Sequence, residues 1–371
     1  MLTVLSVIGT RPEAIKMAPV IKELERHPER VRSVVCSTGQ HREMLEQALA
    51  LFDITPDHDL NLMQVNQGLA QLTARLFSAL DDVLEQVQPD CVLAQGDTTT
   101  VLVASLVAFY RHIPFGHVEA GLRTGDKRHP FPEEINRRLA DVVSDLYFAP
   151  TQRSRQALLA EGRADRDIVV TGNTVIDALL EVADRPYTWS RGPLARLPED
   201  ARFVLITAHR RESFGERFRQ LCFAIRDLAR EFAKDGAHFV YPVHLNPHVR
   251  APVGEILSDT PNVTLMEPLD YDSLVHLMQR SVLILTDSGG IQEEAPSLGV
   301  PVLVMRETTE RPEGIEAGVV KLVGTSRERI VAEARALLSD PAAHAAMATR
   351  ANPYGDGHAA ERIVAAILER L

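Results

Sequence analysis

Cysteine and tryptophan are scarce in this chain of 371 residues, which contains three cysteines and one tryptophan. The cysteines, Cys36, Cys91 and Cys222, lie far apart and show no paired spacing. This pattern excludes a disulfide framework and is typical of reduced thiols in a cytosolic protein. We therefore expect a cytoplasmic protein with free thiols.

Long apolar runs are also missing, and none approaches the roughly 20 residues that a membrane-spanning helix needs. The N-terminal stretch MLTVLSVIGTRPEAIKMAP has no basic leader, and Gly9 and Pro12 interrupt its apolar run. It therefore predicts a buried strand rather than a signal peptide. No contact with a membrane is expected.

Basic residues do not dominate, because 40 Lys and Arg stand against 51 Asp and Glu, for a formal net charge of -11. A nucleic-acid partner is not expected, since such proteins usually carry a basic face. A small anionic ligand held by a few local arginines remains compatible with this charge. The sequence contains neither a G-x-G-x-x-G dinucleotide fingerprint nor a Walker A motif.

Short β-branched runs alternate with helical patterns along the chain, which predicts an α/β protein with parallel sheets covered by helices on each face. The strands that we expect are 2–9, 31–38, 90–96, 113–119, 145–150, 167–172, 202–208, 238–243, 262–266, 281–287, 300–305 and 319–323. The clearest helical patterns cover 13–26, 68–87, 215–233, 271–280, 326–339 and the C-terminal stretch.

The alternation lapses over residues 184–201, which contain three prolines and the only tryptophan. This segment is predicted to be a linker between a first domain, 1–183, and a second domain, 202–354. Two domains also fit the length, which exceeds the size that one hydrophobic core usually reaches. Ligands of open α/β sheets bind beyond the carboxyl ends of the strands, and domain interfaces are favoured ligand sites. We therefore expect a ligand cleft between two facing halves.

Charged residues follow several expected strands of the first half. Arg11 and Lys16 begin the helix after the first strand, where a helix N-terminus and two cations would suit an anion; ordinary surface charges are the alternative. Asp97 follows the strand 90–96, and it either caps the next helix or acts in a cleft. Glu119 ends the run IPFGHVE and is expected at the carboxyl edge of the sheet.

The loop and helix after Glu119 carry two adjacent glutamates, Glu133 and Glu134. Each is spaced i, i+4 from an arginine, so two surface ion pairs, with Arg137 and Arg138, are one interpretation. Adjacent glutamates cannot point the same way on a helix, so one of them can face a cleft.

The second half places polar residues after its strands in the same way. His209 follows the strand 202–208 and is a candidate acid, base or charge stabiliser. Ser288, Gly289 and Gly290 form a turn before a helix, where exposed amides favour a diphosphate. Glu294, about one turn into that helix, is within reach of ribose hydroxyls, and Arg311 can add a charge-assisted contact.

Zinc is not expected, although His244 and His248 are four residues apart. Pro247 lies between them, and no cysteine or paired carboxylate stands nearby, so the ligand set of a zinc site is missing.

The motifs GTRPEAIKMAP, GQHREML, GDTTT, GHVEAGLRTGD, PEEINRR, GNTVIDALL, HRRESFG, YPVHLNP, TDSGGIQEEAPSLGVPVLVMR and NPYGDG occur in this order along the chain. In these motifs the sequence resembles the non-hydrolysing UDP-N-acetylglucosamine 2-epimerases of bacteria, nearly from end to end. The resemblance implies two Rossmann-like domains in the glycosyltransferase-B arrangement, with a last helix, 355–371, that crosses back to the first domain. It also implies a homodimer that interconverts UDP-GlcNAc and UDP-ManNAc without nicotinamide or metal.

The resemblance assigns roles to residues by their place in these motifs. The essential carboxylates and histidine of the family correspond to Asp97, Glu119, Glu133 and His209. The substrate-binding residues correspond to Arg11, Lys16, Ser288, Gly289, Gly290, Glu294 and Arg311, with Leu269 and Leu274 near the uracil. Some relatives bind a second UDP-GlcNAc as an activator, at positions corresponding to Gln40, His41, Arg210 and His244. Glu43 stands where regulated relatives can carry glutamine, so the sequence does not predict such activation.

Three other functions remain open from the sequence. A retaining glycosyltransferase shares the scaffold and the UDP site, but the carboxylates of the first half favour the epimerase. A hydrolysing epimerase differs by admitting one water to the cleft. A nucleotide-sugar-binding regulator without chemistry is disfavoured by four intact ionisable positions.

Overall fold

The chain folds into two compact units. The computed structural model describes residues 1–39, 42–62 and 67–371. Unit 1 comprises Met1–Ala178 and Gly355–Leu371, and unit 2 comprises Leu179–Tyr354. The division falls inside helix α7 (Thr174–Ala183), earlier than the boundary expected at residue 183. Residues 184–201 contain no helix or strand and belong to unit 2, where Leu194 is buried.

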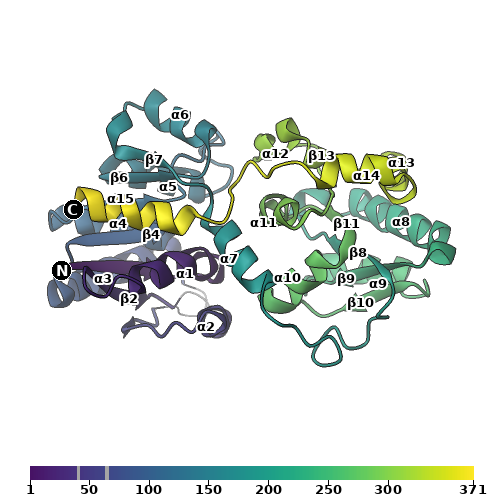
Figure 1. The fold of residues 1–371 in the computed structure, drawn as a ribbon, viewed down its shortest axis with the longest axis horizontal. Helices are drawn as coiled ribbons and strands as arrows, with labels where there is room; N and C mark the ends of the chain where they lie inside the picture. Colours follow the sequence, from purple (N-terminus) through teal and green to yellow (C-terminus); the bar gives the residue numbers. More distant parts are fainter. Residues whose placement is uncertain (40–41, 63–66) are drawn as a thin grey trace. The chain divides into compact units, whose positions relative to one another are not determined.

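Unit 1 is built on one parallel sheet of seven strands in the order β3-β2-β1-β4-β5-β6-β7 (Figure 1). The strands are β1 (Leu2–Ile8), β2 (Val31–Ser37), β3 (His58–Asp59), β4 (Cys91–Gln95), β5 (Phe115–Val118), β6 (Leu146–Ala149) and β7 (Ile168–Val170). The helices are α1 (Arg11–Glu25), α2 (Arg42–Leu51), α3 (Leu69–Val87), α4 (Thr99–Tyr110), α5 (Glu133–Val143), α6 (Gln152–Ala160), the start of α7 and α15 (Ala359–Arg370).

Unit 2 repeats the same plan with six parallel strands in the order β10-β9-β8-β11-β12-β13. The strands are β8 (Arg202–Thr207), β9 (Ala237–Pro242), β10 (Val263–Met266), β11 (Ser281–Thr286), β12 (Val302–Val304) and β13 (Val320–Leu322). The helices are α8 (Glu216–Glu231), α9 (Pro247–Leu257), α10 (Tyr271–Gln279), α11 (Gly289–Glu294), α12 (Pro312–Ala317), α13 (Arg327–Ser339) and α14 (Pro341–Ala348).

The strand order confirms the expected fold class of two Rossmann-like units. In each sheet the chain first moves outward to one side and then reverses, between β1 and β4 in unit 1 and between β8 and β11 in unit 2. Such a reversal opens a crevice at the carboxyl ends of the two central strands, where open α/β sheets bind ligands. The residues that follow β1, β4, β8 and β11 are therefore the first candidates for a site.

The sequence explains why the central strands and helices of unit 1 are interior. Every residue of β4 is buried, as the apolar run predicts for a strand covered on both faces. Helix α4 behind it is apolar on all sides and is buried along most of its length. Helix α1 starts sharply because Thr10 and Glu13 form a capping box at its N-terminus.

The C-terminal helix α15 belongs to unit 1, as expected. It packs against α1, and Figure 1 shows it in yellow alongside that helix. Ile363 and Ile367 are fully buried in this contact region. The Asp177 carboxylate accepts a hydrogen bond from the Ala360 amide at 2.8 Å, which fixes the start of α15.

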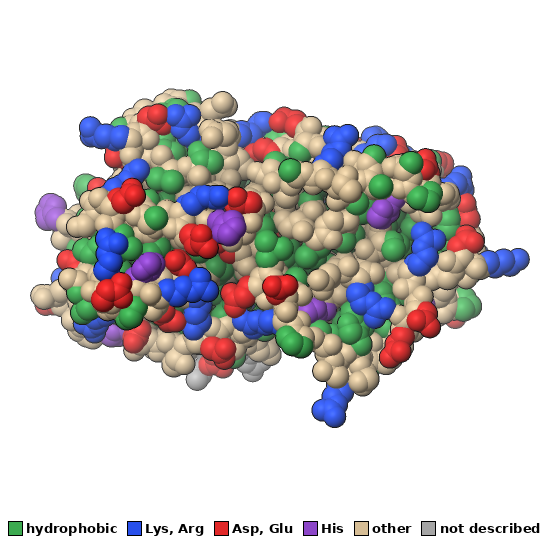
Figure 2. Space-filling view, viewed as in Figure 1, with side chains coloured by type: hydrophobic (Ala, Val, Ile, Leu, Met, Phe, Trp, Pro, Cys, Tyr) green, Lys and Arg blue, Asp and Glu red, His purple; other side chains and the backbone are tan. Residues whose placement is uncertain are grey.

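Charge is distributed without a single-sign face on the side shown in Figure 2, where Lys and Arg are interspersed with Asp and Glu. Among the residues that the structure describes, no helix is both long and apolar enough to cross a membrane.

Candidate active site

Glu119 adopts a strained backbone conformation directly after β5. Its φ angle is 68°, in the left-handed region that side chains other than glycine rarely adopt. Such strain costs about 1–3 kcal/mol and persists only where the surroundings impose it, typically at functional sites. The side chain is only 5% exposed, so its carboxylate is held inside the protein.

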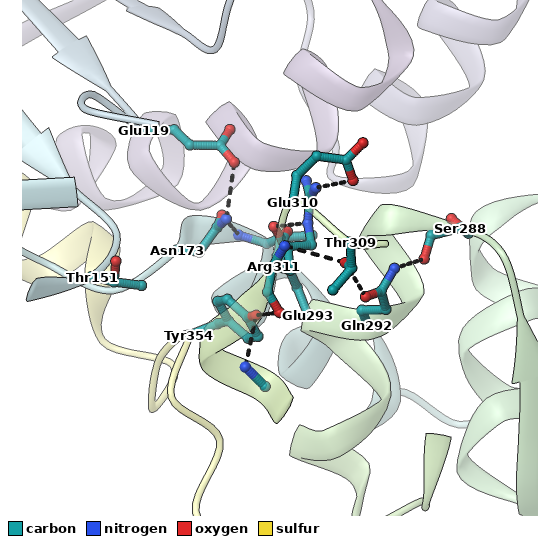
Figure 3. A network of polar contacts seen from close by, with 12 residues as sticks. Glu119, Thr151, Asn173, Ser288, Gln292, Glu293, Thr309, Glu310, Arg311 and Tyr354 are labelled. Carbon is teal, nitrogen blue, oxygen red and sulfur yellow. Dashed lines mark hydrogen bonds and ion pairs between the residues drawn. The ribbon is translucent and has the colours of Figure 1, made fainter. Parts of the chain in front are cut away.

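Donors from three other segments hold the Glu119 carboxylate. Lys16 of α1 places its Nζ 2.7 Å from Oε1 and 2.8 Å from Oε2. The Asn173 amide donates to Oε1 at 3.1 Å, as Figure 3 shows, and the Gln95 amide donates to Oε2. The cation Lys16, which the sequence marked as a ligand residue, therefore also neutralises a buried carboxylate. Arg11, its predicted companion, begins α1 and is half-buried.

Asp97 follows β4 and is not the helix cap that one interpretation of the sequence expected. Thr98 caps α4 instead, because its side chain accepts a hydrogen bond from the Val101 amide. The Asp97 carboxylate pairs with the Arg137 guanidinium, with Nη2 2.5 Å from Oδ2. The Asn136 amide donates to the Asp97 carbonyl at 3.0 Å. Two consecutive residues of α5 thus fix both the backbone and the side chain of Asp97.

The adjacent glutamates of α5 do not form the expected i, i+4 ion pairs. Arg137 pairs with Asp97 and, at 3.6 Å, with Glu134, while Arg138 pairs with Glu161 of the loop after α6. Glu134 is fully buried. Its carboxylate accepts hydrogen bonds from the amides of residues 124 and 125 and so fastens the loop before α5. Glu133, the predicted catalytic residue, is half-buried at the first position of the helix.

In unit 2, His209 follows β8 beside a buried carboxylate. Asp287, after β11, accepts hydrogen bonds from the amides of His209 and Arg210, each at 2.7 Å. The His209 Nδ1 lies 3.7 Å from Asp287 Oδ1, and its ring stacks on that of His244 with the centroids 5.1 Å apart. Burial lowers the pKa of His209 in spite of Asp287, and the neighbouring His244 and Arg210 lower it further.

The helix after β11 begins earlier than the sequence predicts, because Ser288 is its N-cap and Gly289 and Gly290 are the first residues of α11. An added Cβ at Gly289 would lie 3.0 Å from the Arg311 guanidinium carbon, so this arginine packs directly over the glycine. Arg311 also donates through Nε to Glu293 at 2.6 Å. Figure 3 shows Arg311 in the same group of polar side chains as Ser288, Gln292 and Thr309.

A hydrogen-bonded network orders the loop that carries Arg311. The backbone amide of Arg311 donates a hydrogen bond to the Thr309 hydroxyl at 3.2 Å. That hydroxyl donates to the side-chain oxygen of Gln292 at 2.7 Å. Gln292 in turn donates to the Ser288 carbonyl at 2.9 Å (Figure 3). The predicted diphosphate residues of unit 2 are therefore brought together on one ordered surface.

The predicted ribose residue, Glu294, is buried and accepts a hydrogen bond from the Tyr271 hydroxyl at 2.8 Å. Leu269 is buried and Leu274 is half-buried, both close to the start of α10. Of the predicted activator positions, Arg210 and His244 lie beside His209, whereas Gln40 and His41 lie outside the described residues.

Comparison with known proteins decides the family. A model described as UDP-N-acetylglucosamine 2-epimerase matches residues 22–368. The chain belongs to this family. It is 54% identical over 370 residues to the UDP-N-acetylglucosamine 2-epimerase of Escherichia coli K12, with 98% of each chain covered.

Solved structures of the epimerase family share the whole fold. The UDP-GlcNAc 2-epimerase of Neisseria meningitidis, in a crystal structure bound to UDP-GlcNAc, is 48% identical, with a TM-score of 0.89 and all of both chains covered. The Methanocaldococcus jannaschii enzyme, in complex with UDP-GlcNAc and UDP, is 31% identical, with a TM-score of 0.80, and the match covers 99% of this chain and all of that one.

A buried histidine–aspartate pair of this epimerase-family chain was not found from the sequence. His117 and Asp141 are both fully buried, and His117 Nδ1 lies 2.6 Å from Asp141 Oδ1. The signal was available, because His117 stands two residues before Glu119 in an otherwise apolar strand. Its partner, on α5, could not be assigned without the fold. In the part of the chain that the structure describes, no group of three or more His, Cys, Asp or Glu residues is arranged to hold a metal ion.

Glu13 is another carboxyl residue that the sequence did not mark as a candidate. It lies in the first turn of α1. Its Oε2 accepts hydrogen bonds from the amides of Gly9 and Thr10 at 2.6 and 3.0 Å. Burial raises the pKa of Glu13 from 4.5 to about 7, although the Thr98 hydroxyl and these amides oppose the shift, and Asp97 raises it further. The epimerase-family chain thus keeps a carboxyl group that titrates near neutrality next to Asp97.

The raised pKa makes stability depend on pH in a defined direction. The folded state binds the Glu13 proton more tightly than the unfolded state, so ionisation between pH 4.5 and about 7 costs stability. We expect Glu13→Gln, which does not titrate, to gain about 3 kcal/mol relative to the unsubstituted protein between about pH 4 and about pH 8. Urea unfolding across this range measures the difference.

Glu25→Gln, at the exposed end of the same helix, is the control and should show no such trend. A stability difference between Glu13→Gln and the unsubstituted protein that stays constant with pH would contradict the raised pKa.

Proposed function

We propose that this chain interconverts UDP-GlcNAc and UDP-ManNAc by eliminating UDP and adding it back through 2-acetamidoglucal. The observation that carries this proposal is that Asp97 and Glu119 follow the paired, adjacent strands β4 and β5, whose ends Gln95 and Val118 lie opposite each other. Retaining glycosyltransfer requires a nucleotide site but not a pair of carboxylates here. Membership of the epimerase family and the relatives bound to UDP-GlcNAc support the same conclusion.

The chemistry explains why carboxylates are needed. The hydrogen at C2 of the sugar is barely acidic, because no carbonyl group adjoins it. Departure of UDP from C1 with the C1–O bond electrons lets the C2–H electrons form a C1–C2 double bond, while a base takes the proton. Protonation of C2 from the opposite face and return of UDP to C1 complete the inversion. Acids and bases must therefore serve both faces of the ring.

Unit 2 supplies groups suited to the leaving nucleotide. The Ser288–Gly290 segment and the guanidinium of Arg311 would hold the diphosphate, and Glu294 would bind the ribose. His209 would stabilise the charge that develops on the leaving UDP. Electrostatic stabilisation by preorganised donors is commonly the largest contribution to such a step.

In unit 1 the carboxylates differ in their surroundings. Glu119 already accepts from Lys16, Gln95 and Asn173, which suits a residue that orients the sugar and Asp97. We infer that Asp97 and Glu133 exchange protons with the substrate, each serving one face of the ring. Arg11 and Lys16 would contribute ligand contacts from the start of α1.

The proposed activity has a place in metabolism and in the cell. UDP-ManNAc is a donor of ManNAc units, so a reaction that builds cell-surface polysaccharide is the class that would consume the product. Sugar nucleotides of this kind are used in the cytoplasm, which is where we place the protein.

Incubation with UDP-GlcNAc in D₂O, without any acceptor, tests the proposal. We expect UDP-ManNAc to appear and both sugar nucleotides to carry deuterium at C2, because the proton is exchanged with solvent at the base. Proton NMR of the sugar measures both. Free ManNAc would instead indicate the hydrolysing reaction, and an unchanged sugar would favour a glycosyltransferase or a binding protein without chemistry.

Asp97→Asn is the matched variant for this experiment. It should bind UDP nearly as well as the unsubstituted protein, but deuterium incorporation and turnover should fall at least about 10²-fold, the low end of general acid–base effects. An equal loss of UDP binding and rate would show that Asp97 contributes to binding rather than to proton transfer.

We also propose that the partner of the chain is a second copy of itself. Large apolar side chains are exposed on two neighbouring helices of unit 1: Phe109 and Tyr110 on α4, and Leu139 and Val142 on α5. Contiguous apolar surface of this kind commonly marks a protein interface.

Light scattering coupled to size-exclusion chromatography should give twice the chain mass. Val142→Glu places a charge among these apolar side chains and should yield a monomer, whereas Leu245→Glu, at an exposed leucine of unit 2, should leave the mass unchanged. A dimer that survives Val142→Glu would place the interface elsewhere.

A further inference from the structure

His117 makes two short contacts within the core of unit 1. Its Nδ1 lies 2.6 Å from Asp141 Oδ1, and its Nε2 lies 2.7 Å from the carbonyl oxygen of Gly96. The ring is fully buried, so water does not compete for either nitrogen. Gly96 directly precedes Asp97, and the contact therefore reaches the backbone from which the proposed catalytic carboxylate projects.

Both partners of the ring lack a hydrogen to donate. A peptide carbonyl is only an acceptor, and Asp141 already accepts from Arg123 at 2.7 Å and from the Gly121 amide at 3.3 Å through its other oxygen. A neutral imidazole has one N–H, so one of its two contacts would set a lone pair against an acceptor. With Asp141 ionised, as its contacts with Arg123 and the Gly121 amide favour, the two distances together require a doubly protonated ring.

The surrounding charges favour that state. Burial opposes a charged His117, but Asp141 and the Gly96 carbonyl more than compensate and raise its pKa. Burial likewise opposes the Asp141 carboxylate, yet His117 and Arg123 hold the pKa of Asp141 below its usual value. Arg123 lowers the pKa of His117 and so acts against this shift. Arg123 is itself paired with Glu161 at 2.8 Å.

We propose that His117 is a positioning residue for Asp97 and that it acts as an imidazolium held in place by Asp141. The inference rests on the proposed function only in giving Asp97 a role in proton transfer. The imidazolium fixes the Gly96 carbonyl, Asn136 fixes the Asp97 carbonyl, and Arg137 fixes the carboxylate. Two donors of α5 thus hold Asp97 itself, His117 holds the residue before it, and α5 also carries Asp141.

The same ion pair connects the two loops of the site. Through His117 it fixes the end of β4, and through the Gly121 amide it fixes the loop just after Glu119. Tyr147 of β6 donates its hydroxyl to the Asp141 carbonyl at 3.0 Å and keeps this part of α5 on the sheet. A change of charge at His117 would therefore move Asp97 relative to Glu119, and a misplacement of about 1 Å can cost about 10²-fold in rate.

The protonation state is tested directly, without any activity measurement. Protein labelled with ¹⁵N-histidine should show, for one ring that His117→Gln removes from the spectrum, two protonated nitrogens from about pH 6 to about pH 8. A single protonated nitrogen on that ring at about pH 8 would overturn the proposal, whatever the catalytic activity of the protein.

Asp141→Asn tests the consequence for the proposed reaction. The isosteric amide removes the charge that keeps His117 protonated, so burial should make the ring neutral near about pH 8. We expect kcat for epimerisation to fall about 10- to 100-fold there, to recover as the pH is lowered, and KM for UDP-GlcNAc to change little. The unsubstituted protein should show no such recovery on acidification.

Glu161→Gln is the control, because it weakens the Arg123 pair of the same network without a bond to His117. Like Asp141→Asn, it should weaken the contacts that hold Arg123. Unlike Asp141→Asn, it should leave the pH profile of kcat unchanged. A pH profile of Asp141→Asn parallel to that of Glu161→Gln would reduce the ion pair to a purely structural role and contradict the proposal. An unsubstituted protein that lacks epimerase activity would instead refute the proposed function and leave the NMR result standing.

Discussion

Glu119 has a left-handed backbone conformation directly after a buried strand. Its carboxylate is held by Lys16, Gln95 and Asn173, and this cluster is the constraint on which the site of unit 1 depends. The three donors come from α1, β4 and the loop before α7. The first two segments reach Glu119 because β1, β4 and β5 are consecutive strands of the sheet. Strain at one residue is therefore offset by contacts that only the complete sheet can supply.

The second constraint is the pairing of charges away from water. Ionised groups in a protein interior destabilise the fold unless each has a partner with good geometry. Unit 1 meets this condition with Lys16 on Glu119 and Arg137 on Asp97, and unit 2 meets it with Arg311 on Glu293. Burial raises the pKa of Glu13, which shows how the protein accommodates a carboxyl group held by backbone amides instead of a cation. The ion pairs orient the carboxylate groups, and the strand ends at the carboxyl edge of the sheet determine where those residues lie.

Much of the fold was predictable because it follows from local pattern. Apolar β-branched runs marked the strands, and helical spacing marked helices such as α3 and α8, so two α/β units with parallel sheets could be expected from the pattern, and the family resemblance implied that they are Rossmann-like. The two-residue strand β3 carries too little pattern to be found. The place where the units divide depends on contacts across the fold, and it falls within α7 rather than at the expected linker.

The sequence indicated where the candidate residues stand relative to the strands, but not what they contact. Asp97 and Glu119 follow strands, so their location could be inferred, yet the ion pair between Asp97 and Arg137 joins residues that are distant in sequence. The sequence suggested that Arg137 pairs with Glu133, because helical spacing is the only relation visible without the fold. The His117–Asp141 pair escaped notice for the same reason.

The central claim is that UDP leaves the sugar completely before it returns. The most direct measurement supplies the protein with UDP and 2-acetamidoglucal and no sugar nucleotide, and follows the mixture by phosphorus and proton NMR. The account predicts that UDP-GlcNAc and UDP-ManNAc both form. A mixture that stays unchanged, with a protein that epimerises UDP-GlcNAc under the same conditions, would contradict it.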